Sequence, residues 1–372
     1  MICQVILTPL EPYFFGDERT FSYSDAPASI GNSYFIKSQD TPSQTTLFGV
    51  LRYLGNREKT FTGGYQRDDE AIGKQSYDLS DSSNSNFGWI HKISPLLITD
   101  SHDDFYVPVP LDHMPTETTY TPYEWTTESQ TVVDGSGPVK RLLPKPRTNL
   151  DEPDPGYASK VGLASGWLNL TTRKVHQDLF RSDVRVGNAA SERGVSSDPS
   201  QSFFKRETKY VSNEDGPCSF TFFADVDDQF TTTDKVAYLG QRRSAFSVRF
   251  IRDAGQICRE VDLLASAVIV NANRHLPSGT VFGYAGSDLY IPAPDRLSRV
   301  CSFVITETRE HRGLLTKYGT ASQKDRFFKR NLLHLIRAGS VFLIDNVQGF
   351  RTQVQDPHAQ IAGFNHVLIK EG

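Results

Sequence analysis

The sequence predicts an α+β fold in which helices lie on one side of antiparallel sheets. Strand-like segments outnumber helical ones along the 372 residues, and each predicted helix is followed by strand-like sequence. Hydrophobic residues make up 38% of the chain and aromatic residues 11%, which is enough to bury a core. A chain of this length is expected to form about two to three domains.

The first elements can be placed from their periodicity. Residues 2–8 are typical of a strand that ends at a turn, and residues 14–21 are typical of a charged loop. We expect the first helix over roughly 42–54, with Thr41 as its N-cap and Pro42 at its first position. Its buried stripe recurs at helical spacing and comprises Leu47, Val50, Leu51 and Leu54, and Gly55 is expected to close it.

Later in the chain the pattern predicts two strands and a second clear helix. Residues 219–227 are typical of a buried strand, and residues 244–253 alternate apolar and polar side chains as a half-exposed strand does. The helix is predicted over 322–339, because Ser322 and Asp325 fit a capping box and Gly339 would end it.

Three stretches are not expected to build a core. Residues 76–89 are polar and should form a loop, and residues 115–160 are rich in proline, which argues against a helix or a central strand. Residues 187–202, "GNAASERGVSSDPSQS", contain Val195 as their only large apolar side chain. We expect this last segment to form a protruding arm carried on two strands.

Composition and charge limit the classes of function. The formal net charge is -4, so any polyanion would have to be bound by local basic patches. The four cysteines have no C-x-x-C spacing, which argues against structural zinc and fits a reducing cytoplasm. The N-terminus lacks the features of a signal peptide, and the longest apolar run, 263–270, is too short to span a bilayer. We therefore expect a cytoplasmic protein without membrane contact.

Nothing in the sequence compels an enzyme. The motifs for phosphate cradling, zinc-dependent hydrolysis and serine hydrolysis are all missing from the chain. We therefore expect no catalytic residue, no metal and no cofactor. His176, near Arg173, Lys174 and Arg181, is the histidine best placed for an anionic ligand. It could be a general acid for RNA cleavage or a polar surface residue.

Local positive charge gathers in four places that could neutralise phosphates, although each could instead be a solvated face. They are Arg173–Lys174 with Arg181 and Arg185; Lys205, Arg206 and Lys209; Arg242–Arg243 with Arg249 and Arg252; and Lys324, Arg326, Lys329, Arg330 and Arg337. Aromatic residues beside the second patch, Phe203, Phe204 and Tyr210, could stack bases.

One face of the first helix carries Thr45, Gly49 and Arg52 at helical spacing. Gly49 removes a side chain, Thr45 offers a hydroxyl and Arg52 offers several donors, so a sugar–phosphate backbone could lie along this row near the helix N-terminus. The alternative is that a neighbouring strand packs closely on Gly49.

The segments "LEPYFFGDERTF" and "YFIKSQDTPSQTTLFGVLR" resemble the start of RAMP-superfamily CRISPR proteins. They are closest to the subunit that caps the 5′ handle of the guide RNA in the type III-B (Cmr) effector complex. "VRVGNAASERGVSSDPSQSFFKRETKYV" is similar to the arm of that family, and "VAYLGQRRSAFSV" is similar to its Gly-rich segment, with Gln241 where a second glycine is expected. "IRAGSVFLI" and "QIAGFNHVLI" resemble its final strands.

This resemblance implies two facing ferredoxin-like (RRM-like) βαββαβ domains, with the crRNA 5′ handle held between them. The first would span 1–230, with an insertion at about 76–160 and the arm at 187–202, and the second would span 236–372. It also implies a non-catalytic subunit that contacts the large palm-domain subunit and a RAMP backbone subunit, and that meets target RNA only indirectly. Together with the basic patches, it implies RNA contacts at Ser38, Gln44, Thr45, Gly49, Arg52, Arg181, Arg185, Gly187, Asn188, Lys205, Arg206, Lys209, Gly240, Gln241, Arg242 and Arg243.

Two other functions stay open. One is a RAMP endoribonuclease that processes precursor crRNA. Such enzymes usually place a catalytic histidine near the first helix, whereas no histidine of this chain precedes His91. The other is the equivalent handle-capping subunit of a type III-A complex.

Overall fold

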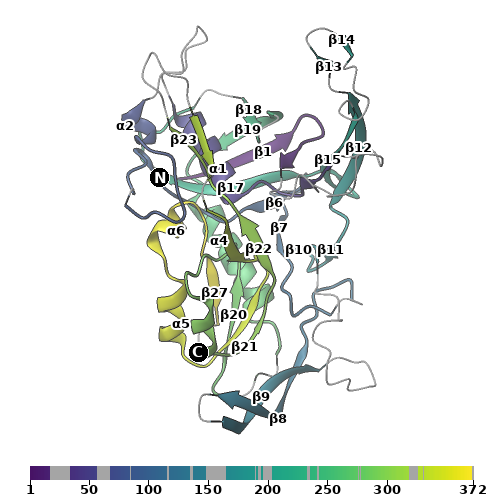
Figure 1. Cartoon of the computed structure of the whole chain (residues 1–372), viewed down its shortest axis with the longest axis vertical. Coiled ribbons are helices and arrows are strands. Elements are labelled where there is room, and N and C mark those ends of the chain that lie inside the picture. Colours follow the sequence, from purple (N-terminus) through teal and green to yellow (C-terminus); the bar gives the residue numbers. More distant parts are fainter. Residues whose placement is uncertain are drawn as a thin grey trace.

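The computed structural model describes residues 1–16, 34–56, 68–83, 85–114, 117–134, 137–147, 165–188, 190–191, 194–195, 203–232, 235–240, 243–274, 276, 278–317, 326–329 and 331–370. Over these residues the protein is a mixed α/β structure, built mostly from antiparallel sheets with few helices (Figure 1). The α+β class predicted from the sequence agrees with this arrangement.

A nine-stranded sheet is organised around β1 (Ile2–Pro9). This strand pairs antiparallel with β17 (Ser219–Val226) on one side and with β19 (Ser244–Ile251) on the other, which confirms the strands predicted in these three segments. On the far side of β19 the sheet ends with β18 (Val236–Leu239). On the far side of β17 it continues with β6 (Leu97–Thr99), β7 (Phe105–Pro108), β10 (Trp167–Asn169) and β11 (Val175–His176). The ninth strand, β5 (Ile90–Ile93), also pairs with β17.

This sheet draws strands from both sides of the domain limits expected from the sequence. β18 and β19 follow the expected boundary at 230–236, yet they lie in the sheet around β1. β5, β6 and β7 fall inside the expected insertion at 76–160, and they too belong to that sheet. Pairing between distant segments, rather than order along the chain, decides which strands share a sheet.

Helix α1 (Gln44–Gly55) covers one face of this sheet. Its N-cap is Ser43, whose hydroxyl accepts a hydrogen bond from the Thr46 amide, so the expectation that Thr41 caps the helix is wrong by two residues. The predicted stripe of Leu47, Val50, Leu51 and Leu54 is buried in the same core as the β1 residues Cys3, Val5 and Leu7.

A second sheet has four antiparallel strands in the order β21 (Cys301–Ile305), β26 (Val341–Ile344), β20 (Val281–Ala285), β27 (Val367–Ile369). Helix α4 (Gly255–Ala265) continues into a π-helical turn, η1 (Ser266–Val270). Val261 and Ile269 of this unit pack in one core with Phe223 of the first sheet and Phe282 of the second. The unit therefore joins the two sheets. The helices described after this unit in chain order are η2 (Pro294–Arg299), α5 (Val347–Val354) and α6 (Pro357–Ile361).

The helix predicted over 322–339 is wrong. β24 (Arg326–Lys329) pairs with β23 (Leu314–Lys317), and β25 (Leu333–Ile336) pairs with β22 (Thr308–His311). The residues proposed as its cap, Ser322 and Asp325, lie outside the described residues. Pairing with preceding strands has overridden the local helical pattern, as tertiary context often does.

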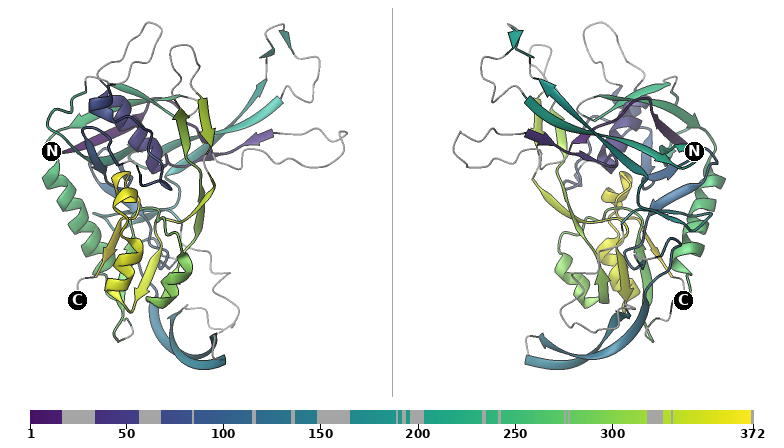
Figure 2. Two further views of the ribbon diagram at one scale, coloured as in Figure 1. Left: turned by 60° about the vertical axis from the view of Figure 1, so that its left-hand side comes forward. Right: turned by 90° about the vertical axis from the view of Figure 1, so that its right-hand side faces the viewer.

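Two long strand pairs project from the body towards opposite ends of the molecule (Figures 1 and 2). β8 (Glu124–Asp134) pairs with β9 (Gly137–Arg147) inside the proline-rich segment and forms a separate two-stranded ribbon, which is neither the helix nor the central strand that the prolines argue against. A two-stranded ribbon tolerates Pro144 and Pro146, because each strand has one edge outside the ladder.

The second projecting pair carries the arm. β12 (Phe180–Asn188) pairs antiparallel with β15 (Phe203–Asn213), and β3 (Tyr34–Ile36) adds to β15 in parallel. We call β12 and β15 the arm ribbon. Beyond it, β13 (Ala190–Ser191) pairs with β14 (Gly194–Val195), and the rest of the expected arm lies outside the described residues.

The remaining elements are short: β2 (Phe15–Gly16), β4 (Ser38–Gln39), α2 (Asp69–Ile72) and β16 (Gly216–Pro217). None of the helices that the structure describes is long and apolar enough to cross a membrane.

A buried ion pair ties the segment after β7 to the end of the α4–η1 unit. The Arg274 guanidinium donates to Asp112 at 2.9 Å, and the two side chains are 1% and 0% exposed. Tyr120 donates to the other Asp112 oxygen at 2.8 Å, and the guanidinium lies 3.6 Å from the centre of the Phe282 ring. Burial alone would lower the pKa of Arg274, but the attraction and hydrogen bonds of Asp112 and Tyr120 together outweigh it and raise the pKa.

Removing one partner should therefore be costly. Asp112→Ala leaves a buried guanidinium without its counter-charge, and we expect the free energy of unfolding to fall by roughly 3–5 kcal/mol in urea titrations. The Asp112→Leu/Arg274→Met double variant should lose less. As a control, Asp103→Ala removes an exposed ion pair with Arg249 at 3.7 Å and should change stability by less than about 1 kcal/mol. An equal loss in Asp112→Ala and Asp103→Ala would contradict this assignment.

Candidate nucleic-acid interface

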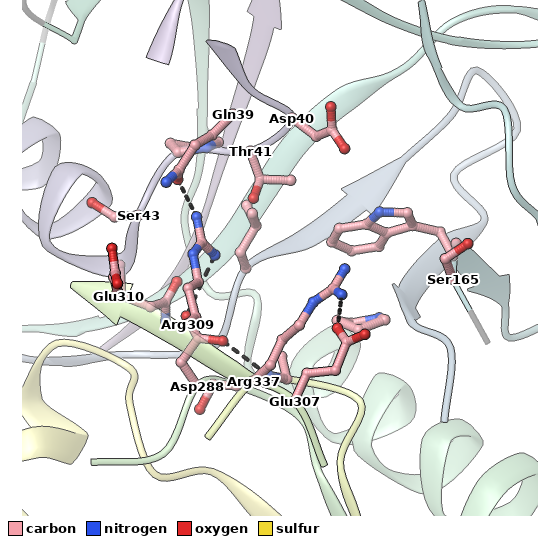
Figure 3. Close-up of a pocket in the computed structure, with 18 of the residues that line it drawn as sticks. Gln39, Asp40, Thr41, Ser43, Ser165, Asp288, Glu307, Arg309, Glu310 and Arg337 are labelled. Atoms are coloured by element: carbon pink, nitrogen blue, oxygen red, sulfur yellow. Dashed lines mark hydrogen bonds and ion pairs between the residues drawn. The ribbon is translucent and has the colours of Figure 1, made fainter. Parts of the chain in front are cut away.

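A groove of about 960 Å³ lies between residues of the first sheet and residues that accompany the second (Figure 3). On the side of the first sheet, the wall consists of the residues that precede α1, the segment after β7, Trp167 and the arm ribbon. On the other side it comes from the loop after β20 and from β22 and β25. The residues that line it are Lys37–Gln44, Leu96, Pro108, Val109, Leu111, Ser165–Trp167, Glu207, Lys209, Gly286–Asp288, Glu307–Glu310, His334 and Arg337–Ala338.

The groove is strongly polar but almost neutral. Its lining includes four cations, Lys37, Lys209, Arg309 and Arg337, and five carboxylates, Asp40, Glu207, Asp288, Glu307 and Glu310. Lys209 lies 3.0 Å from both Asp40 and Glu207. Arg309 forms an ion pair with Asp288 at 3.4 Å and also donates to the side-chain amide oxygen of Gln39. Arg337 forms an ion pair with Glu307, and Figure 3 shows both arginines. A phosphate bound in the groove would have to displace a carboxylate from the cation that it pairs with. The groove is therefore not a site built simply to bind phosphates.

Lys209 and Glu207 stabilise one another's charged forms. Partial burial raises the pKa of Glu207, but hydrogen bonds from Ser182 and Lys209 outweigh burial and hold the pKa below its usual value. Burial likewise lowers the pKa of Lys209, and its bonds to Glu207 and Asp40 reverse that effect. This predicted RNA contact is therefore already held by the protein's own acids.

Gln44, at the first position of α1, lines the groove but uses its side chain within the protein. Its side-chain amide donates to the Gly363 carbonyl at 2.8 Å and to the Ser94 carbonyl at 3.2 Å, and the side chain is buried. Gly363 has a φ of +80°, and a Cβ there would meet the Gln44 amide and the Ser94 carbonyl. Gln44 was predicted as an RNA contact, and the structure gives it a structural role at the edge of the groove.

Ser38 is also engaged within the chain. Its hydroxyl accepts a hydrogen bond from the Phe15 amide at 3.0 Å, and its own amide donates to Glu207 at 3.3 Å. The side chain is buried at the groove wall. Ser38, Gln44 and Lys209 are thus the predicted site residues that the groove brings together.

The row of Thr45, Gly49 and Arg52 does not form one exposed face. Arg52 is buried, donates to the carbonyls of Ile72 at 2.9 Å and Gly73 at 3.2 Å, and lies over the Phe87 ring. Its expected exposure is wrong, because the short α2 segment packs against α1 and its carbonyls take up the guanidinium. Thr45 is half-buried beside the Ser43 hydroxyl at 3.0 Å.

Gly49 is exposed, and in the part of the chain that the structure describes no atom, apart from those of its chain neighbours and its own helix backbone, lies within 4 Å of the position that a Cβ would take. Close packing of a strand on this glycine, the alternative weighed from the sequence, is therefore not found. The surface at Gly49 is open to a partner.

These two helix positions should respond oppositely to substitution. Arg52→Ala leaves two buried carbonyls without a donor, and we expect it to lower the free energy of unfolding by roughly 1–3 kcal/mol. Gly49→Ala adds a side chain in open space and should raise it by up to about 1 kcal/mol. Thermal melting of both variants beside the wild type tests this. Destabilisation by Gly49→Ala as large as that by Arg52→Ala would show that the glycine is packed.

The arm ribbon gathers three predicted arginines on one side. Residues directly opposite each other in an antiparallel pair share a face, and faces alternate along each strand. Arg181 lies opposite Tyr210, and Arg185 lies opposite Arg206, so these four side chains share one face, which we call the arginine face. Lys209 lies opposite Ser182 on the other face, towards the groove.

The arginine face is the most basic of the predicted surfaces. Arg181, Arg185 and Tyr210 are exposed, and Asp183 pairs with Arg185 at 2.9 Å. Gly187, Asn188 and Lys205 lie further out on the same paired strands. The predicted site residues that belong to the arm ribbon therefore divide between its two opposite faces.

The Gly-rich turn between β18 and β19 is described only in part, because Gln241 and Arg242 lie outside the described residues. Gly240 has a φ of +71°, and a Cβ there would lie 2.9 Å from the Phe14 carbonyl oxygen. Backbone conformation and this contact account for the glycine without a phosphate. Arg243 is exposed in the turn.

Several groove residues were missed from the sequence. Trp167, Arg309 and His334 line the groove but were not named from the sequence, and Arg337 was named only in the fourth basic patch and not among the predicted RNA contacts. The helix wrongly predicted over 322–339 hid the position of the last two, since β25 and the residues after it lie along the groove. His176 lies away from it, edge-on to Tyr106 with ring centres 5.4 Å apart.

Comparisons with known proteins define first a class and then a family. A family model described as "CRISPR-associated protein (Cas_Cmr3)" matches residues 5–262, so the chain is of the CRISPR-associated class. Within that class it belongs to the Cas_Cmr3 family. This confirms the resemblance seen in the sequence motifs. No match was found among curated proteins.

Two solved structures are similar in fold. One is described as a cryo-EM structure of the Type III-B Cmr-beta bound to cognate target RNA, and the other as the same assembly bound to cognate target RNA and AMPPnP, state 1. In each, a chain matches with a TM-score of 0.51 and 12% identity over 98% of this chain and 96% of that chain.

Proposed function

We propose that this chain is a non-catalytic RNA-binding subunit of a type III-B CRISPR ribonucleoprotein effector complex in antiviral defence, where it caps the 5′ handle of the crRNA. Its membership of the Cas_Cmr3 family supports this, as does its similarity in fold to a chain of Cmr-beta. The observation that carries the proposal is the groove between the two sheets, where Ser38, Gln44 and Lys209 come together at the start of α1. The family match favours this assembly over its type III-A equivalent.

The chemistry of the groove suits recognition of an unpaired RNA strand by its bases. Carboxylates and amides such as Asp288, Glu310 and Gln39 can bond to base edges and ribose hydroxyls, and the Trp167 indole can stack on a base. The N-terminal amides of α1 add partial positive charge at one end. Phosphate contacts would come mainly from the arginine face of the arm ribbon.

The proposal includes the fold and partners implied by the sequence. The two sheets would derive from two ferredoxin-like domains. The subunit would bridge the large palm-domain subunit and a RAMP backbone subunit in the cytoplasm, and would meet target RNA only indirectly. The two strand pairs that project towards opposite ends of the molecule offer separate surfaces for such partners (Figure 1).

Handle recognition can be tested in the reconstituted complex. We expect a guide with its natural 5′ handle to be retained better than a guide whose handle is scrambled at equal length. Arg309→Gln/Arg337→Gln should reduce this discrimination, because it changes the hydrogen bonding of the groove. Arg259→Gln on α4, an exposed arginine outside the groove, is the matched control. Equal retention of both guides by the wild type would refute handle capping.

The precursor-processing endoribonuclease is the second candidate, and one observation favours it. His334 is exposed at the groove, next to Glu310 across the β22–β25 pair, where an acid and a base could act on RNA. We expect no site-specific cleavage when the purified protein is incubated with repeat RNA, with or without Mg²⁺. Cleavage that His334→Ala abolishes and His176→Ala leaves intact would establish the nuclease instead.

A further inference from the structure

An uncovered part of the first sheet carries a row of exposed side chains outside the groove. Tyr238 on β18 lies directly opposite Ala245 on β19. The Leu10 amide donates to the Ala245 carbonyl at 3.0 Å, which places Leu10 on the other side of the same alanine. Tyr238 is 58% exposed and Leu10 is 57% exposed. The small alanine between them leaves the tyrosine ring accessible.

The next row on this face consists of small hydroxyl residues and one valine. Val236 lies opposite Ser247, Ser247 opposite Thr8, and Thr8 next to Ser219. The Thr8 and Ser219 hydroxyls are hydrogen-bonded at 2.6 Å. We call the surface formed by Leu10, Thr8, Val236, Tyr238, Ala245 and Ser247 the Tyr238 face. The opposite side of these strands is packed, because Ala237, Leu239 and Phe246 are buried in the core beneath α1.

Cations surround this face. Arg243 is exposed in the turn that joins β18 to β19, and Lys235 is exposed at the other end of β18. Arg249 follows Ser247 on the same face, is 62% exposed, and meets Asp103 only at 3.7 Å. Among the residues that the structure describes, the other nearby acid is Glu11, which accepts a hydrogen bond from the Ala245 amide at 3.1 Å. Three described cations therefore face two described carboxylates.

We propose that the Tyr238 face binds single-stranded RNA, with a base stacked on the Tyr238 ring and the adjacent phosphates near Arg243 and Arg249. The inference rests on the proposed function and adds a further RNA surface, which takes a segment outside both the groove and the arginine face. An exposed aromatic ring beside a cationic turn, over a floor of hydroxyls, is the arrangement that stacks bases on open sheets.

The test uses the full-length protein and a fluorescein-labelled twelve-nucleotide oligoadenylate, measured by anisotropy. We expect Tyr238→Ala to weaken binding by roughly 5- to 150-fold, the range for loss of one base–aromatic stack. Tyr238→Phe keeps the ring and should bind within about twofold of the wild type. The ratio between wild type and Tyr238→Ala should not change with salt, whereas Arg243→Ala should lower the slope of affinity against salt by about one.

Leu263→Ala, which truncates an exposed side chain on α4, is the matched control and should bind as the wild type does. The proposal is overturned if wild-type protein binds no oligoadenylate, if Tyr238→Ala binds as tightly as wild type, or if Tyr238→Phe loses as much affinity as Tyr238→Ala. Impaired subunit assembly with unchanged RNA affinity in Tyr238→Ala would instead identify a protein interface. Discrimination between natural and scrambled handles belongs to the groove and should be unchanged in Tyr238→Ala, so the two proposals can fail separately.

Discussion

The position of β1 between β17 and β19 is the constraint on which the rest of the structure depends. These strands come from the start of the chain and from two segments beyond residue 218, so closing the sheet brings the long intervening chain back to one place. One face of β1 is buried under α1, which fixes where the N-terminus of that helix lies. The groove lies there, and at its edge Gln44 donates to the Gly363 carbonyl near the end of the chain.

Much of the first sheet could be predicted from the sequence, and strands were also correctly expected within "IRAGSVFLI" and "QIAGFNHVLI", whereas the segment 322–339 could not be predicted. The strands at 2–8, 219–227 and 244–253 have clear apolar patterns, and α1 has a strong buried stripe. The segment 322–339 has an equally good helical pattern, but part of it pairs with strands that precede it. Local periodicity contains no information about such partners, so the error could not have been found from this segment alone.

The candidate site was predictable in type of residue but not in arrangement. Arg52 was expected to be exposed because it shares a helix face with Thr45 and Gly49, away from the leucine stripe. The carbonyls of Ile72 and Gly73, some twenty residues on, bury it. Lys209 is at the groove as a basic-patch residue should be, yet Asp40 and Glu207 balance its charge. Counting basic residues along a chain cannot show which carboxylates the fold will place beside them.

Side chains alternate between the two faces of the arm ribbon. Its function is therefore expected to depend on whether an odd or an even number of residues is inserted into its strands. A single residue inserted in β12 or β15 between the body and the arginine face would shift the pairing by one position and turn every later side chain to the other face. The arginines would then point towards the groove. Insertion of two residues would preserve the faces and merely lengthen the ribbon. Relatives whose arm strands differ in length by an even number of residues can therefore keep the same side chains on each face. A difference of an odd number of residues requires a compensating bulge.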